Sequence, residues 1–169
     1  MTVSLFTFVD LFSRSVATAE HLLEKGEGHA KAEGLAPEAI LDWRLIDDMQ
    51  PLRFQLMVVC NFSQQWTARA AGLAEPESVS DTLDIAGFKV ALAASKAYLA
   101  GLTAEQFAGR DDVPVTHTIG TGMTPTLSAA QWLTSFATTN LYFHLSTAYG
   151  ILRSKGVAIG KADLFPAGL

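Results

Sequence analysis

The stretch SAAQWLTSFATTNLYFHLSTAYGILRSK, from Ser128 to Lys155, decides the fold of this chain. It begins with a Ser-x-x-Gln capping box and stops before Gly156, which are common signals for the two ends of a helix. Its apolar residues project onto two roughly opposite faces of that helix. One face holds Trp132, Phe136, Thr139, Asn140, Phe143, Thr147 and Ile151, and the other holds Leu141, Leu145, Ala148 and Leu152. A helix with two apolar faces is either central in a bundle or packed against a second chain.

Three further stretches, residues 4–33, 49–71 and 82–100, show the three- and four-residue apolar spacing of helices. Short helices are predicted at residues 37–43, where a proline stands in the first turn, and after Thr103. Candidate N-cap residues precede two of the long helices: Asp47 or Asp48 before the second, and Ser80, Asp81 or Thr82 before the third.

Between residues 113 and 127 the apolar spacing changes from helical to alternating. VTHTI, GTG and MTPTL follow one another there, which is typical of two short strands around a glycine-containing turn. An isolated hairpin is marginally stable, so we expect it to lie on the helices. We predict an all-α protein with one domain over residues 1–169: a four-helix bundle of the up-down type, with short extra helices and one small β-hairpin before the last long helix.

Composition and charge exclude several classes of protein. The 169 residues have a net charge of −5, which argues against a nucleic-acid partner because nucleic acids bind basic surfaces. The single cysteine, Cys60, excludes an internal disulfide and favours a reducing compartment. The uncharged stretch 113–152 is broken by proline, glycine and many hydroxyl residues, so it does not predict a membrane span. We predict a cytoplasmic protein that binds neither membranes nor nucleic acid.

The scarcity of charge also predicts self-association. Charged residues make up 17% of the chain, against about 25% in typical domains. The second long helix is uncharged from Phe54 to Ala68 and apolar beyond one stripe, and the last helix has two apolar faces. Exposed patches of this size are uncommon on monomers. We therefore expect a symmetric homodimer built from these helices.

Polar residues interrupt one apolar face of the last helix. Asn140 and His144 are one turn apart, Thr147 lies beside them, and Trp132 shares the face. Buried polar groups need hydrogen-bond partners. One interpretation is the polar floor of a cavity that binds a small apolar or aromatic molecule. The other is a core histidine satisfied by a neighbouring group.

Metal and nucleophile signals are weak. The four histidines, His21, His29, His117 and His144, show no His-x-x-x-His spacing, and a metal site needs at least three ligands. Cys60 lies mid-helix without a nearby cation, so it is interpreted as a small buried hydrophobe. We predict no bound metal and no cofactor.

Three stretches resemble a known family. NLYFHLSTAYGILRSKGVAIGKADLF (140–165) is similar to the C-terminal signature of the domain-of-unknown-function family numbered nineteen-ninety-three, and RLIDDMQPLRFQ (44–55) and GHAKAEGL (28–35) agree with it. This family in turn resembles the DinB/YfiT-like superfamily of four-helix bundles. Many members of that superfamily bind a divalent metal through three histidines, some are thiol-dependent transferases or isomerases, and they commonly dimerise.

The metal ligands of the superfamily do not carry over residue by residue. A metal site of this kind needs two ligands one turn apart on the fourth long helix. The residues at these places here are Asn140 and His144, and only His144 is a good ligand. Close relatives have an acidic residue and a histidine at the places of Asn61 and Phe62, and Phe62 cannot ligate a metal. The resemblance thus implies the bundle fold and a cavity near His144 without a catalytic metal. The candidate ligand-binding residues are His144, Asn140, Thr147, Gln55 and Trp132.

Three functions remain open at this stage. The first is a dimeric bundle that binds a small, largely apolar or aromatic molecule near His144. The second is a DinB-like metal- or thiol-dependent transferase or isomerase in which His144 acts as a general base or a metal ligand. The third is a purely structural or interaction dimer. The family label names no reaction.

Overall fold

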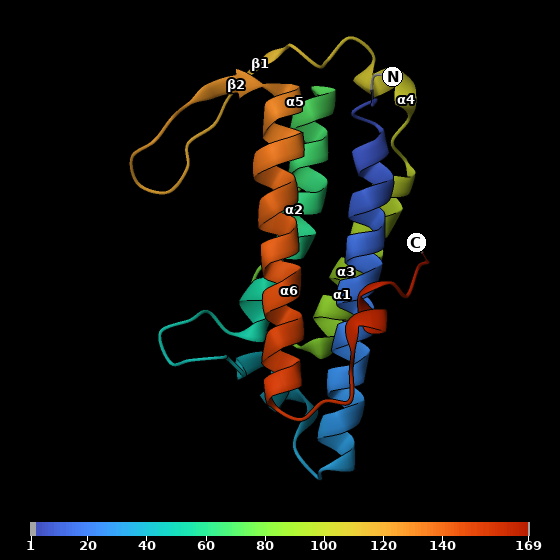
Figure 1. Ribbon diagram of the computed structural model, residues 1–169, viewed down its shortest axis with the longest axis vertical. Helices are drawn as coiled ribbons and strands as arrows, with labels where there is room; N and C mark the ends of the chain where they lie inside the picture. The colour runs from blue at the N-terminus through green and yellow to red at the C-terminus, as the bar shows by residue number, and fades with distance from the viewer. Residues whose placement is uncertain (1–2, 169) are drawn as a thin grey trace.

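Four long helices form the bundle predicted from the sequence. The computed structural model describes residues 3–168. The long helices are α1 (Thr7–Ala32), α2 (Leu52–Ala71), α3 (Ile85–Ala100) and α6 (Thr138–Ser154). They lie side by side along the long axis of the molecule (Figure 1). The expected all-α bundle is therefore confirmed. Among residues 3–168, no helix combines the length and the apolar character that crossing a membrane requires.

The predicted short elements are also present. They are η1 (Pro37–Asp42), α4 (Ala104–Phe107) and the strands β1 (Pro114–Thr116) and β2 (Thr126–Ser128). A further short helix, η3 (Lys161–Leu164), is not predicted from the sequence. The strands pair antiparallel, with Val115 opposite Leu127. The hairpin rests on the bundle because the Trp132 indole N–H donates to the carbonyl oxygen of Val115 at 2.8 Å.

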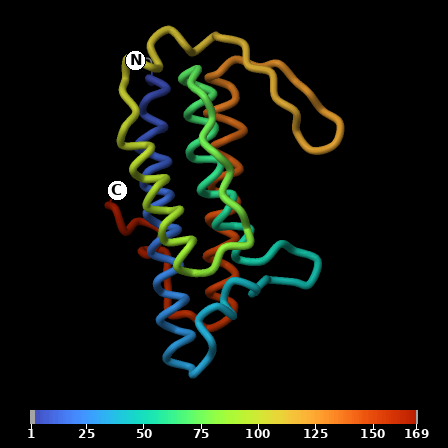
Figure 2. Tube along the Cα trace, turned by 180° about the vertical axis from the view of Figure 1, so that it is seen from behind, coloured from blue at the N-terminus to red at the C-terminus, as the bar shows by residue number. Residues whose placement is uncertain are grey.

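The helices α2 and α3 point in the same direction. Between them, residues 73–84 run back along the outside of α2, as Figure 2 shows from behind. Side chains of α2 bind this segment, and their partners follow one another in the opposite direction along the chain. Arg69 pairs with Glu75, and Gln65 donates to Ser78. Asn61 bonds both backbone groups of Val79, and Arg53 donates to the carbonyl of Asp81. Because this return segment makes α2 and α3 parallel, the four helices do not alternate in direction as the predicted up-down type requires.

The last helix begins earlier than α6 and contains one wide turn. It runs from α5 (Ala129–Gln131) through the π-helical segment η2 (Trp132–Ala137) into α6. Both bonds of the predicted capping box form: Ser128 Oγ accepts from the backbone N–H of Gln131, and Gln131 Oε1 accepts from the N–H of Ser128. The Thr138 hydroxyl donates to the carbonyl of Leu133, five residues back, which matches the wider turn.

The two apolar faces of the last helix have different roles, and the structure corrects one expectation. Leu141, Leu145, Ala148 and Leu152, predicted as a surplus face for a partner chain, are buried in the core of the single chain. Two aromatic residues of α6 are exposed: Phe143, on the other face, with 58% of its surface accessible, and Tyr142, with 42%. That other face is buried at Trp132, Thr147 and Ile151, so both faces of the helix contribute to the core.

The N-caps also differ from the predicted ones. Neither Asp47 nor Asp48 caps α2, which begins after Pro51 without a side-chain cap. Helix α3 is capped by Asp84 rather than by Ser80, Asp81 or Thr82: one Asp84 carboxylate oxygen accepts from the N–H of Gly87 at 2.7 Å.

We expect Asp84→Ala to lower the free energy of unfolding by about 1 kcal/mol, because the first turn of α3 loses its side-chain acceptor. The matched control is Asp81→Ala, which removes a carboxylate three residues away that makes no cap. Urea denaturation of both variants measures the difference. An equal loss of unfolding free energy in the two variants would show that removal of a negative charge, and not loss of the cap, accounts for the effect.

Candidate functional site

The candidate site is built on a hydrogen bond between α2 and α6. Nδ1 of His144 lies 2.7 Å from Oε1 of Gln55, which is 89 positions away in the sequence. Gln55 is 2% exposed. Its amide nitrogen donates to the carbonyl oxygens of Gln50 at 2.9 Å and of Pro51 at 3.4 Å. The glutamine therefore ties the histidine of α6 to the first turn of α2.

This geometry defines the tautomer of His144. Because both backbone partners of the Gln55 amide are acceptors, its nitrogen must face them and its oxygen must face the imidazole. The Gln55 oxygen can only accept, so Nδ1 of His144 holds the proton. Nε2 then presents a lone pair, and it makes no hydrogen bond to any residue in the range 3–168. Such a nitrogen can accept a hydrogen bond, take up a proton or bind a metal.

Burial keeps the imidazole neutral. Desolvation lowers the pKa of His144 from 6.5 to about 4. The ring lies between Phe54 of α2, with ring centroids 5.9 Å apart, and Phe143 of α6, at 5.1 Å. These neighbours are apolar and offer no charge that would stabilise an imidazolium. At neutral pH, His144 is therefore an uncharged acceptor at the edge of the α2–α6 contact.

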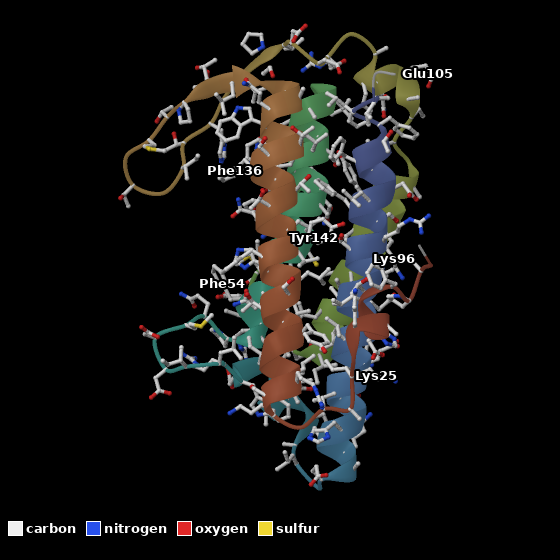
Figure 3. The ribbon with its side chains drawn as sticks, in the orientation of Figure 1. Lys25, Phe54, Lys96, Glu105, Phe136 and Tyr142 are labelled. Carbon is white, nitrogen blue, oxygen red and sulfur yellow. The ribbon has the colours of Figure 1, made fainter. Side chains whose placement is uncertain are left out.

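An aromatic cluster continues from the site toward the hairpin. The Trp66 and Trp132 rings stack with centroids 4.9 Å apart, and Phe62, Phe136 and His117 pack around them. Figure 3 shows Phe54 and Phe136 on the same side of the bundle. The apolar face that surrounds His144 thus runs along α2 and the last helix up to the hairpin.

The predicted site residues are brought together only in part. Gln55 and His144 are in contact, whereas Asn140 is half-buried and its amide donates to the carbonyl of Phe136 in its own helix. Thr147 is buried, and its hydroxyl donates to the carbonyl of Phe143. Trp132 is 1% exposed and holds the hairpin. His144 itself is half-buried.

The donor set of the site is poor for a metal. Within residues 3–168, no three His, Cys, Asp or Glu side chains come together as a metal-binding group. The rings of Phe54 and Phe143 pack near the His144 imidazole, and the hydrogen-bond partner of its Nδ1 is a neutral amide. Divalent metals prefer imidazole, thiolate and carboxylate ligands. Cys60 is buried in the core, where desolvation raises its pKa to about 11 and keeps the thiol protonated.

One feature near α6 was missed by the sequence analysis. A cavity of about 210 Å³ lies between α1, α6 and the C-terminal segment, and Arg14 and Tyr142 line it. Tyr142 precedes His144 by two residues and lies on the side of α6 that faces α1 (Figure 3). No local pattern marks this cavity, because its third wall comes from residues 164–168, at the far end of the chain.

Comparisons with known proteins agree with the fold. A crystal structure of a DinB family member from Shewanella denitrificans superimposes with a TM-score of 0.87 at 28% identity, covering 95% of this chain and 91% of that one. No curated protein matches the sequence. The family model described as "Domain of unknown function (DUF1993)" matches residues 6–165. This chain therefore belongs to the DUF1993 family and has a DinB-like fold.

Proposed function

We propose that this protein is a homodimer that binds a small, largely apolar or aromatic molecule beside the Gln55–His144 pair, without a catalytic metal. The observation that supports this best is the lone pair of His144 Nε2, fixed by Gln55 and set between two aromatic rings. A ligand with an apolar body and one O–H or N–H donor matches this arrangement, since small-molecule sites combine apolar walls with a few placed polar groups.

The proposed dimer uses the outer face of α2 and the last helix. Its exposed or half-buried residues include Phe54, Met57, Phe136 and Phe143. The hairpin and the loop 43–51 project from the two ends of this same side (Figure 1). A two-fold axis would place identical uncharged faces together and enclose His144 between the copies. A stable interface needs about 800 Å² from each copy.

Phenol tests the ligand site, because it has an aromatic body and a single O–H donor. In NMR titrations phenol should perturb the ring signals of His144. His144→Phe should weaken phenol binding about tenfold, because the phenol O–H loses its hydrogen bond to the desolvated Nε2. Toluene, which lacks the donor, is the matched probe and should bind both proteins alike. Equal phenol binding by the wild type and the variant would contradict the proposed site.

A DinB-like enzyme remains the second candidate, because a neutral imidazole with a free Nε2 is also the form that acts as a general base or metal ligand. Elemental analysis of protein purified without chelators separates the two proposals. Stoichiometric zinc, nickel or manganese that His144→Phe abolishes would favour the enzyme and overturn the metal-free proposal.

A further inference from the structure

A cavity lies on the opposite side of α6 from the Gln55–His144 pair. The cavity between α1, α6 and the C-terminal segment has a volume of about 210 Å³. The volume that a water molecule occupies in the liquid is about 30 Å³, so the cavity has room for a single small ring with one substituent. Its walls are mostly apolar, being formed by Leu11, Leu145, Leu164, Phe165 and Ala167.

The C-terminal segment forms one wall because a polar stripe of α1 holds it in place. Arg14, Thr18, His21 and Lys25 follow one another at steps of four, three and four residues, so they share one face of α1. Nη1 of Arg14 donates to the carbonyls of Ala167 and Gly168 at 3.3 and 3.1 Å. Thr18 donates to the carbonyl of Leu164, and the next two residues of the stripe pair with the carboxylate of Asp163.

The polar groups that line the cavity differ in whether they can still donate a hydrogen bond to a ligand. The buried hydroxyls of Ser15 and Thr18 already donate to backbone carbonyls, so they offer no donor to a ligand. Arg14 is the one charged side chain among the described lining residues. Its Nε bonds Asp10 and its Nη1 bonds the tail, whereas Nη2 makes no hydrogen bond to any residue from 3 to 168. Tyr142 adds a hydroxyl to the lining.

We propose that this cavity binds a small monocarboxylate with an apolar body, its carboxylate on Arg14 and its body between α1, α6 and the C-terminal segment. A guanidinium donates strong, charge-assisted hydrogen bonds to a carboxylate, and the apolar walls receive the remainder of the ligand. The site is separate from His144 and does not depend on the function proposed there.

Benzoate and benzyl alcohol test the proposal, since they share a ring and differ in the charge of the head group. In NMR titrations both should shift the methyl signals of Leu145 and Leu164, and benzoate should bind about tenfold more tightly. Arg14→Met should remove this difference, so that benzoate binds no more tightly than benzyl alcohol. Equal affinities in the wild-type protein, or shifts confined to other residues, would overturn the proposal.

Two further variants distinguish charge from tail anchoring and from the site at His144. Thr18→Val removes a hydrogen bond to the tail but keeps the guanidinium, so it should leave the preference for benzoate intact. If it lowers benzoate affinity as much as Arg14→Met, anchoring of the tail accounts for binding and the carboxylate assignment is wrong. His144→Phe should leave benzoate binding unchanged. The proposal for this cavity can therefore fail or hold independently of the proposal for the site at His144.

Discussion

Leu141→Asp should unfold the protein, whereas Phe143→Asp, two residues away, should leave it folded. Leu141 is 0% exposed in the core, where a carboxylate would be cut off from water. Burying such a charge costs more than about 4 kcal/mol, a large part of the 5–15 kcal/mol that stabilises a typical domain. Phe143 is 58% exposed, so a carboxylate at that position stays hydrated. Circular dichroism during urea denaturation measures both effects.

The same pair of variants tests the proposed dimer. If the face around Phe143 joins two copies, light scattering at micromolar concentration should give about twice 18.1 kDa for the wild type and a monomer for Phe143→Asp. Val90→Asp is the matched control, because Val90 is an apolar residue of α3 that is 71% exposed. A wild-type mass of 18.1 kDa at all concentrations would contradict the dimer, and a folded Leu141→Asp would contradict the core assignment.

The second large effect is a loss of stability in mild acid that depends on His144. Its pKa falls from 6.5 to about 4 on folding, so the unfolded chain binds more protons between these values and stability decreases as the pH falls through that window. A shift of this size corresponds to about 3 kcal/mol, which partial exposure of the ring reduces to about 2 kcal/mol. Above pH 6.5 the effect is absent.

Comparison with His144→Phe isolates this contribution. The variant leaves the Gln55 oxygen unpaired, which lowers stability by a similar amount at every pH, so the informative quantity is the slope of unfolding free energy against pH. That slope should be smaller in the variant between pH 4 and 6.5. Parallel curves would contradict the assigned burial. Burial also lowers the pKa of His117, and because both proteins contain this residue its effect cancels in the comparison.

The local elements of this protein could be predicted from the sequence. Apolar spacing of three and four residues depends only on helix geometry, and it located all four long helices. The capping box at Ser128 and the alternating hairpin residues are short-range patterns that form in the structure as expected. The family was indicated by a resemblance of three stretches, residues 28–35, 44–55 and 140–165, and not by this spacing.

The candidate site could be predicted only in part. His144 and Gln55 were both proposed, but no pattern indicated that they touch, because their contact joins helices separated by 89 positions. Asn140 and His144 share a face at helical spacing, yet the amide of Asn140 bonds its own helix. The partner of a polar side chain depends on which groups lie within about 3 Å, and sequence spacing does not give that distance.

Only the tertiary structure decided how far each apolar face of the last helix is buried. Both faces look equivalent in projection, yet the face with Leu141 and Leu152 is buried throughout, whereas the other is buried at Ile151 and exposed at Phe143. The direction of α3 was likewise set by long-range bonds, chiefly from Asn61 to Val79, which hold the return segment along α2. The sequence by itself thus determined the helices and the family, since these depend on neighbouring residues. The packed faces, the Gln55–His144 pair and the cavity under the C-terminal segment depend on contacts between distant parts of the chain.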